Sequence, residues 1–298
     1  MEKLIDHYLE YLVLTKNTSP NTLSSYKRDL VRLTNYLQIH EVTVINEVRY
    51  SHLQNFVNDL SKRNLSDSTI TRSIAAFRGY FKYLELNRII SLNPSNNIRP
   101  IKVKQKVPVV MTLEEVERFL DLPNDTNKGV RDKAMLEILY ATGIRATELI
   151  RLKLSDVNIP LAFIQCDDGK KQRIIPIGKI CKLSLMNYIE DVRCVLIKDD
   201  VTFNDPDTPL FVNSRGTKLS RQGFWKIIKG YGDAINPEKD ISPHVLRHSF
   251  ACHLIQNGAD LRSVQEMMGH ESIISTQIYT KISEHKLKEV YLKAHPRA

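Results

Sequence analysis

Residues 242–250 read S-P-H-V-L-R-H-S-F, a stretch that combines a helix start with two side chains able to bind an anion. Ser242 followed by Pro243 is typical of an N-cap and the first turn of a helix. His244 and Arg247 then lie three residues apart, on the same face of that first turn. The free backbone N–H groups of a helix N-terminus also favour a phosphate there. The stretch therefore predicts a helical domain whose site includes this helix start.

Two further residues with reactive side chains follow this helix. His270 comes after Gly269, at the end of a helix that Asp260 is expected to open, and Tyr279 lies nine residues further on. A phenol has a pKa near ~10, so Tyr279 needs nearby cations in order to attack at neutral pH. Taken alone, such a tyrosine is more often part of a core, and a histidine and arginine in a first turn are more often solvated. Their occurrence together is what indicates a site.

A second arginine stands upstream, in residues 131–149, which read R-D-K-A-M-L-E-I-L-Y-A-T-G-I-R-A-T-E-L. A helix predicted over residues 130–140 stops at Gly143, because glycine accepts the left-handed conformation at a helix end. Arg145 follows, and alone it would be interpreted as a surface arginine paired with Glu148. With it the chain offers two guanidiniums, two imidazoles and one phenol, without a carboxylate cluster for a metal. These groups suit transfer of DNA to a tyrosine, and they are Arg145, His244, Arg247, His270 and Tyr279.

These motifs and their spacing resemble the tyrosine recombinases of the phage integrase family, and within them the Xer type. The likeness includes H-V-L-R-H-S-F-A-C-H-L, the M-G-H and I-Y-T segments and the terminal H-P-R-A, and it runs from the first helix to the last residue. It implies a 3′-phosphotyrosyl link that a 5′-hydroxyl from another strand can reverse, with no ATP, metal or cofactor. It also implies that Tyr279 is the nucleophile, and that the scissile phosphate is held by Arg145, His244, Arg247 and His270.

The resemblance further implies a general-acid lysine in a β-hairpin, and here the chain departs from the family pattern. The family motif reads like G-K-G-x-K-x-R, whereas residues 166–173 read C-D-D-G-K-K-Q-R, and a gapless match puts Asp168 at the usual lysine position. Lys170 and Lys171 are the nearest lysines. Either can reach the 5′-oxygen leaving group, because a lysine side chain is long and flexible. Lys170 is slightly favoured because it directly follows a glycine, as in the family motif.

The first 92 residues are predicted to form a bundle of about four helices. Apolar residues recur at intervals of three and four, and strand patterns are missing from this part of the sequence. Ser19 before Pro20 is typical of an N-cap, and either Ser66 or Asp67 can cap a later helix. The resemblance identifies this bundle as a SAM-like core-binding domain that clamps DNA. Two of its cations are candidate DNA contacts, Arg72 and Lys82.

Residues 93–108 contain three prolines and alternate lysine with other residues, which predicts an extended linker between two domains. A solvated edge strand is the alternative. In the linker interpretation each lysine could neutralise a DNA phosphate and release a counterion. The candidate contacts are Lys102, Lys104 and Lys106.

The remaining residues, 109–298, are expected to form the catalytic domain. Thr112 and Glu115 have the spacing of a capping box. Short β-prone runs at residues 162–166 and 173–177 predict an antiparallel hairpin, and the rest is mostly helical. The fold class is therefore mainly α, with a mixed α/β catalytic domain that carries a small antiparallel sheet.

The tail, residues 283–298, carries one helical apolar stripe, made of Leu287, Val290 and Tyr291. In the resembling family such a C-terminal helix passes cyclically between subunits. The tail is therefore expected to be an exchange helix that docks on a neighbouring protomer and limits cleavage to some protomers at a time. The alternative is a helix that packs on its own domain.

The composition favours a polyanionic partner. Lysine and arginine number 43 against 34 acidic residues, which gives a net charge of +9. The N-terminus carries acidic residues and no apolar run of signal-peptide length, and no segment approaches the ~20 apolar residues of a membrane span. A cytoplasmic protein without membrane insertion is expected. Reduced and mostly buried thiols are expected at Cys166, Cys181, Cys194 and Cys252.

The expected partner is a double-stranded DNA recombination site, bound by a homo- or hetero-tetramer. The resemblance suggests resolution of chromosome dimers at a dif-like site, with a second Xer-type recombinase and a septal DNA translocase as further candidate partners. An integrase or transposon-type recombinase and a type IB topoisomerase are the alternatives in chemistry, although the N-terminal bundle favours a recombinase. A helical DNA-binding regulator would not explain the five site residues, and a magnesium nuclease would need an acidic cluster.

Overall fold

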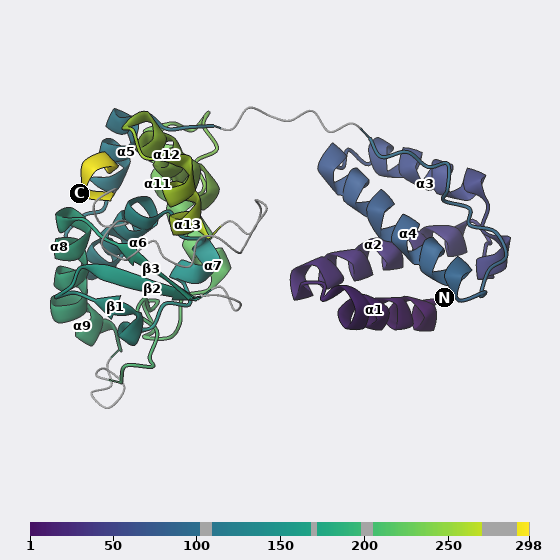
Figure 1. The fold of residues 1–298 in the computed structure, drawn as a ribbon, viewed down its shortest axis with the longest axis horizontal. Coiled ribbons are helices and arrows are strands. Elements are labelled where there is room, and N and C mark those ends of the chain that lie inside the picture. Colours follow the sequence, from purple (N-terminus) through teal and green to yellow (C-terminus); the bar gives the residue numbers. More distant parts are fainter. Residues whose placement is uncertain (102–108, 168–171, 198–204, 270–290, 298) are drawn as a thin grey trace. The chain divides into compact units, whose positions relative to one another are not determined.

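The computed structural model describes residues 1–101, 109–167, 172–197, 205–269 and 291–297 (Figure 1). The chain divides into two compact units, Met1–Lys106 and Val107–Ala298. Both are mainly helical, and the second carries a small antiparallel sheet, so the predicted fold class is confirmed. Each helix within the described residues is too short or too polar to span a lipid bilayer.

The N-terminal unit is the predicted bundle of four α-helices. They are α1 (Glu2–Lys16), α2 (Pro20–Ile39), α3 (Tyr50–Lys62) and α4 (Asp67–Leu86), with a short 3-10 turn η1 (Ile45–Glu47). The Ser19 hydroxyl accepts from the Thr22 N–H at 3.2 Å and caps α2. Ser66, and not Asp67, caps α4 through the Thr69 N–H at 3.4 Å. The apolar stripes of all four helices meet in one core, centred on Leu53, Phe56, Ile74 and Phe81.

An ion pair between α2 and α4 holds the candidate DNA contact Arg72. Its Nε and Nη2 donate to the two carboxylate oxygens of Asp29 at 2.8 and 3.2 Å. The Asp29 side chain is almost completely buried, whereas that of Arg72 is half-exposed. Two donors of the Arg72 fork therefore join two helices of the bundle. Lys82, the other candidate in this unit, is exposed on α4.

The close approach of α1 to α4 requires a glycine at position 79. An alanine Cβ there would overlap the hydroxyl of Tyr8, a buried side chain. We expect Gly79→Ala to lower the free energy of unfolding by about 1–3 kcal/mol, because overpacking outweighs the better helix propensity of alanine. Gly230→Ala is the matched control, since an added Cβ meets nothing within 4 Å. The control should gain about 0.5–1 kcal/mol. Urea unfolding of the full chain measures both, and equal effects would contradict the packing argument.

The N-terminal unit extends beyond the expected boundary at residue 92. Ile98 and Ser95 are buried, and the Asn93 carboxamide accepts from the Ser95 N–H at 2.9 Å in a tight turn. The Thr71 hydroxyl also donates to the Ile101 carbonyl at 3.1 Å. The expected linker therefore differs from the structure at residues 93–101, because Ile98 completes the bundle core. The candidate DNA contacts of the linker, Lys102, Lys104 and Lys106, lie outside the described residues.

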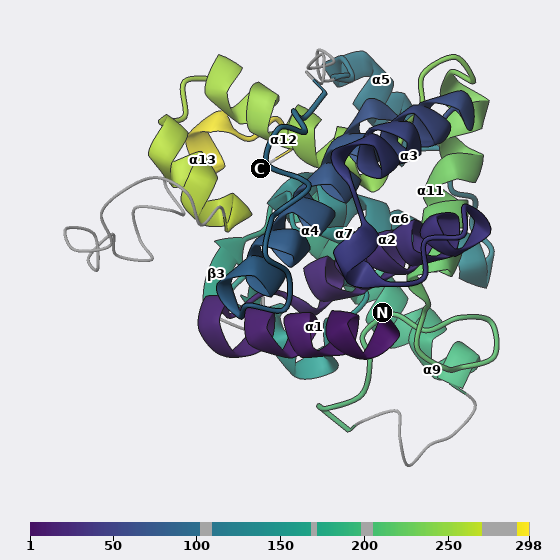
Figure 2. The same cartoon turned by 90° about the vertical axis from the view of Figure 1, so that its right-hand side faces the viewer.

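The C-terminal unit surrounds the long helix α6. Its helices are α5 (Leu113–Leu120), α6 (Asn127–Thr142), α7 (Ala146–Leu149), α8 (Lys179–Asn187), α9 (Arg193–Ile197), α11 (Arg221–Ile235), α12 (Pro243–Gln256) and α13 (Leu261–Met268). A 3-10 turn η2 (Leu154–Asp156) precedes the sheet, and a π-helical turn η3 (Tyr188–Val192) joins α8 to α9. Helices α8 and α12 both pack on α6 (Figure 1), and α13 lies beside α12 (Figure 2).

The sheet has three antiparallel strands in the order β1 (Val157–Asn158), β2 (Phe163–Asp167) and β3 (Gln172–Pro176). Ile164 of β2 faces Ile175 of β3, and both are buried. The predicted hairpin is therefore confirmed, with each strand shifted by about one residue. The capping box is also confirmed, since the Thr112 N–H donates to Glu115 at 2.9 Å and the Glu115 N–H donates to Thr112 at 3.1 Å.

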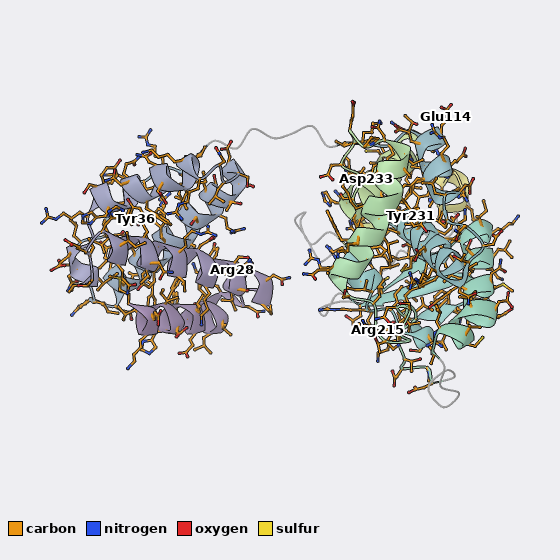
Figure 3. All side chains as sticks on the ribbon, turned by 180° about the vertical axis from the view of Figure 1, so that it is seen from behind. Arg28, Tyr36, Glu114, Arg215, Tyr231 and Asp233 are labelled. Atoms are coloured by element: carbon orange, nitrogen blue, oxygen red, sulfur yellow. The ribbon has the colours of Figure 1, made fainter. Side chains whose placement is uncertain are left out.

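A buried polar network joins α6 to α11. The Tyr231 hydroxyl, labelled in Figure 3, donates to Asp132 at 3.2 Å. Arg131 donates to the other oxygen of Asp132 and to the Val212 carbonyl at 3.1 Å. Desolvation of Asp132 raises the pKa of its carboxyl group despite these donors. The network fixes α11, which forms one exposed side of the unit.

The last described residues, 291–297, lie on their own domain. Tyr291 is completely buried, and its hydroxyl accepts from the Gly178 N–H at 3.1 Å. Asn257 donates to the Ala294 carbonyl at 2.9 Å, and Arg297 forms an ion pair with Glu137 at 2.6 Å. In this single chain residues 291–297 therefore show the cis alternative, because their apolar and charged groups find partners in their own domain, and docking of the tail on a neighbouring protomer stays a prediction. Residues 283–290 lie outside the described residues.

The four cysteines are free thiols, as expected. Burial raises the pKa of the Cys166 thiol to about 12 and that of Cys181 well above its usual value. Cys252 is half-buried and Cys194 is exposed, so the prediction that most of the thiols are buried holds only for the first two.

Candidate active site

The start of α12 carries the first two predicted site residues. The Ser242 hydroxyl accepts from the Val245 N–H at 3.4 Å, which confirms the predicted N-cap. His244 is exposed in the first turn, whereas the Arg247 side chain turns inward and is buried. Arg247 donates through Nη1 to the Gly143 carbonyl and through Nη2 to the Met268 carbonyl at 2.6 Å.

A left-handed turn after α6 brings the second arginine to the same place. Gly143 ends α6 with φ 59°, and an added Cβ would overlap the ring of Phe250. Only glycine satisfies both the backbone conformation and this contact. Arg145 follows as the N-cap of α7 and donates through Nη2 to the Gly269 carbonyl at 2.8 Å. One turn therefore presents a carbonyl to Arg247 and carries Arg145.

The C-terminal end of α13 is the point at which the arginines meet. Three consecutive carbonyls accept from three different arginines, namely Met267 from Arg173 at 2.9 Å, Met268 from Arg247 at 2.6 Å and Gly269 from Arg145 at 2.8 Å. The partial negative charge of a helix C-terminus favours cations there. Gly269 ends the helix with φ 63°, as predicted. The arginines thus fix the residue that directly precedes His270.

Glu148 lies between two of these arginines and is almost completely buried. It accepts from the Arg145 N–H at 2.6 Å and from both Nη atoms of Arg173 at 2.9 Å. Burial alone would raise the pKa of Glu148, but hydrogen bonds from Arg173 and from the Arg145 backbone outweigh it and lower the pKa below its usual value. Arg145 does pair with Glu148, as expected for this arginine taken alone. The pair is not on the open surface, however, but inside the arginine cluster.

Sequence reasoning assigned no role in the site to Arg173. Glu148 stands three residues after the N-cap Arg145, at the acidic position of a capping box. This pattern could have indicated that Glu148 binds the start of α7. Arg173 has a weaker signal, because a charged residue in a short strand is usually solvated. Its burial depends on contacts with α7 and α13, which are distant in the sequence.

The electrostatics of the cluster favour an anion. Burial lowers the pKa of Arg247 to about 10, and the positive charge of Arg145 acts in the same direction. Among the described residues around the end of α13, three guanidiniums face one carboxylate. A bound phosphate would relieve this excess of positive charge.

The structure describes part of the predicted site. It brings Arg145 and Arg247 together and places His244 in the first turn of the helix that carries Arg247. The other candidates, Lys170, Lys171, His270 and Tyr279, lie outside the described residues. The two lysines belong to the segment that connects β2 to β3. Asp167 and Gln172, which flank that segment, are paired with each other across the two strands. No three histidine, cysteine or acidic side chains converge as metal ligands in the described ranges.

Two exposed surfaces outside this cluster carry cations that sequence reasoning missed. A cavity of about 630 Å³ lies between α2 and α3, with Tyr36 and Phe56 in its lining (Figure 3 labels Arg28 and Tyr36). Its basic lining residues are Lys27, Arg28, Arg32 and Arg63. On α11, Trp225 is 50% exposed between the exposed Arg221 and Lys226. On α11 this combination of an exposed aromatic with basic side chains is typical of a nucleic-acid surface.

Comparison with protein families gives two matches that together cover most of the chain. Residues 109–286 match the phage integrase family, and residues 5–87 match the N-terminal SAM-like domain of phage integrases. These ranges correspond to the C-terminal unit and to the four-helix bundle.

Curated relatives match over the full length. The tyrosine recombinases XerD of Oceanobacillus iheyensis and Listeria innocua are each 42% identical, and the alignments cover 100% of both chains. Among solved structures, XerH bound to palindromic difH has a TM-score of 0.67 at 24% identity, covering 92% of this chain and 80% of that one. The Tn1549 transposon integrase in complex with transposon right end DNA has a TM-score of 0.71 at 19% identity, covering 90% and 91%. At these identities the two structures show a shared fold.

Proposed function

The chain belongs to the phage integrase family as a site-specific tyrosine recombinase, and we propose that it cuts and rejoins DNA through a bond between Tyr279 and a 3′-phosphate. The observation that carries this proposal is the convergence of Arg145 and Arg247 on the end of α13. Both guanidiniums lie where the chain runs on toward His270 and Tyr279. The α12 N-terminus with His244 adds donors for the same anion.

The residues divide the reaction between them. Arg145, His244, Arg247 and His270 would donate to the non-bridging oxygens of the scissile phosphate. The Tyr279 oxygen attacks phosphorus, and the bond from phosphorus to the 5′-oxygen breaks. Lys170 or Lys171 gives a proton to that oxygen, so the products are a 3′-phosphotyrosine and a 5′-hydroxyl. A 5′-hydroxyl from another strand reverses the step without ATP, since the phosphodiester bond energy is kept.

The two arginines would contribute most in the transition state. Negative charge on the non-bridging oxygens is greatest in the pentacoordinate state, and donors that are already oriented need no rearrangement to stabilise it. The three α13 carbonyls and Glu148 supply that orientation in the described part of the site. Loss of one such donor typically costs ~3–4 kcal/mol in activation free energy.

The surrounding surfaces would hold the duplex. The basic cavity between α2 and α3, the exposed side of α11 and Lys82 are proposed to contact DNA phosphates and bases. Lys102, Lys104 and Lys106 are proposed to follow the DNA backbone between the two units. The net charge of +9 supports such an extended phosphate contact.

Full-length identity to proteins named XerD supports a more specific role. We propose that the chain works as a tetramer on cytoplasmic DNA, with itself or with a second Xer-type recombinase, and resolves chromosome dimers at a dif-like site. A septal DNA translocase is the proposed activator. A type IB topoisomerase has the same reactive groups, but the SAM-like domain favours a recombinase.

A covalent-trapping experiment with a nicked suicide substrate tests the proposed chemistry. The nick lets the 5′-hydroxyl fragment diffuse away, so the protein remains attached to the 3′ end. We expect this adduct to form in excess EDTA, because the proposed phosphate clamp, made of Arg145, His244, Arg247 and His270, consists of protein side chains and not of a metal. Peptide mapping should place the DNA on Tyr279. A strict requirement for magnesium in the cleavage step would contradict the mechanism and would favour a nuclease.

A further inference from the structure

Arg173 is a largely buried arginine at the start of β3 to which the proposed reaction assigns no role. Its side chain is 13% exposed. Its two Nη atoms donate to the two oxygens of Glu148 at 2.9 Å, and its Nε donates to the Met267 carbonyl at 2.9 Å. A bidentate arginine–carboxylate pair is strong and geometrically specific. Arg173 therefore ties the sheet to two other segments at once.

The first of these segments is the start of α7, where Arg145 stands. Glu148 accepts from the Arg145 N–H at 2.6 Å and from Arg145 Nη1 at 3.1 Å. Without Arg173, Glu148 would be a buried carboxylate with fewer donors, and the Arg145 side chain would be its main charged partner. The Arg145 guanidinium would then be drawn toward Glu148 and away from a phosphate.

The second segment is the end of α13. The Met267 carbonyl, held by Arg173, directly precedes the carbonyls that accept from Arg247 and Arg145. The packing is close, because a Cβ at Gly269 would lie 2.9 Å from Arg173 Cζ. A shift of the Arg173 side chain would therefore move the carbonyls that orient both clamp arginines.

We propose that Arg173 is a positioning residue for the phosphate clamp, an inference that rests on the proposed recombinase chemistry. Arg173 acts through Glu148 and through the end of α13, which together hold Arg145 and Arg247 at the geometry that an attacked phosphate requires. A misplacement of about 1 Å in such a site can lower the rate about a hundredfold. The predicted loss is therefore in catalysis and not in affinity for DNA.

Arg173→Gln in the full-length chain tests this, with single-turnover cleavage of a suicide substrate as the measurement. We expect cleavage to slow about a hundredfold, with an unchanged dissociation constant for DNA. Arg173→Lys should be intermediate, because an ammonium group cannot make both the bidentate pair and the Met267 contact. The matched control is Arg118→Gln, which removes an exposed arginine on α5 and should cleave at the wild-type rate. Thermal unfolding of each variant verifies that it is folded.

A second substrate separates positioning of the clamp from general support of the fold. A methylphosphonate at the scissile position has a methyl group in place of one charged oxygen, so the clamp has less charge to stabilise. On this substrate the Arg173→Gln variant should react within about threefold of the wild type. An equal loss on both substrates, or no loss on either, would overturn the proposal.

Two further results complete the test. The Glu148→Gln/Arg173→Gln double variant should lose less than the two single losses combined, since the two residues share the Arg173–Glu148 contact. Additive losses would overturn the proposal. A wild-type chain that forms no covalent adduct would instead overturn the proposed function and this inference with it. If only the expected results for the Arg173 variants fail, the proposed recombinase chemistry stands.

Discussion

Tyr279→Phe should abolish the covalent adduct while DNA binding stays at the wild-type level. The substitution removes one oxygen atom, which is the proposed nucleophile, and leaves the ring in place. The residual rate should be at the detection limit, since no other group would take over the attack. The measurement is trapping on a nicked suicide substrate, with a gel-shift titration of the same DNA for affinity. An adduct at the wild-type level would place the nucleophile elsewhere, with Thr280 as the next residue to test.

Tyr291→Phe is the matched control for this experiment. Tyr291 is completely buried, its hydroxyl accepts from the Gly178 N–H at 3.1 Å, and burial raises its pKa well above the usual value. A phenol in this environment cannot reach a phosphodiester without unfolding its surroundings. The variant should therefore form the adduct at a normal rate and lose about 1 kcal/mol of stability with the hydrogen bond. Loss of the adduct in this variant would contradict the assignment of Tyr279.

Arg247→Lys should lower the cleavage rate by about a hundred- to a thousandfold, with little change in DNA affinity. Lysine keeps a positive charge but cannot donate to the Gly143 and Met268 carbonyls and to a phosphate in one plane. The loss should appear in the rate of a single turnover at saturating protein. Arg118→Lys is the matched control and should cleave normally. A rate within about threefold of the wild type would show that Arg247 is not a clamp residue.

The same variant should keep most of its stability. Burial and the neighbouring Arg145 lower the pKa of Arg247 from its usual value to about 10, so the charged form costs the folded chain about 3 kcal/mol at neutral pH. Because this folded-state pKa is lowered, the destabilisation is fully present below about pH 10 and fades as the pH rises further. Lysine gives up its proton more readily, which offsets the two lost hydrogen bonds. In the wild type, a phosphate bound beside Arg247 would offset the cost of its buried positive charge.

Local sequence patterns predicted the elements that depend on local physics. The caps at Ser19, Thr112 and Ser242 follow from side chains that bond to an N–H three residues away. The end of α6 at Gly143 and of α13 at Gly269 follow from the left-handed conformation that glycine accepts. The hairpin followed from β-prone runs on either side of a turn.

The features that sequence reasoning missed depend on contacts between distant segments. Arg173 is buried because β3, α7 and α13 meet around it, and no local pattern shows that meeting. The ion pair of Arg72 was not predicted, because its partner Asp29 lies 43 residues away. Ile98 was placed in a linker because three nearby prolines favour an extended chain, whereas its side chain packs in the bundle core. The cis contacts of residues 291–297 were not predicted, because the partners Gly178, Asn257 and Glu137 are far upstream.

The cis attachment of residues 291–297 also has a mechanical consequence. The segment that carries the proposed nucleophile lies in the sequence between Gly269, whose carbonyl is held by Arg145, and Tyr291, which is buried. In the proposed reaction DNA is attached to Tyr279, and the exchange of strands would put a load on that attachment. Because both ends of this chain are fastened to one body, that load is divided between two attachments. Neither the end of α13 nor the buried tyrosine then has to resist the whole force while the broken strand is held.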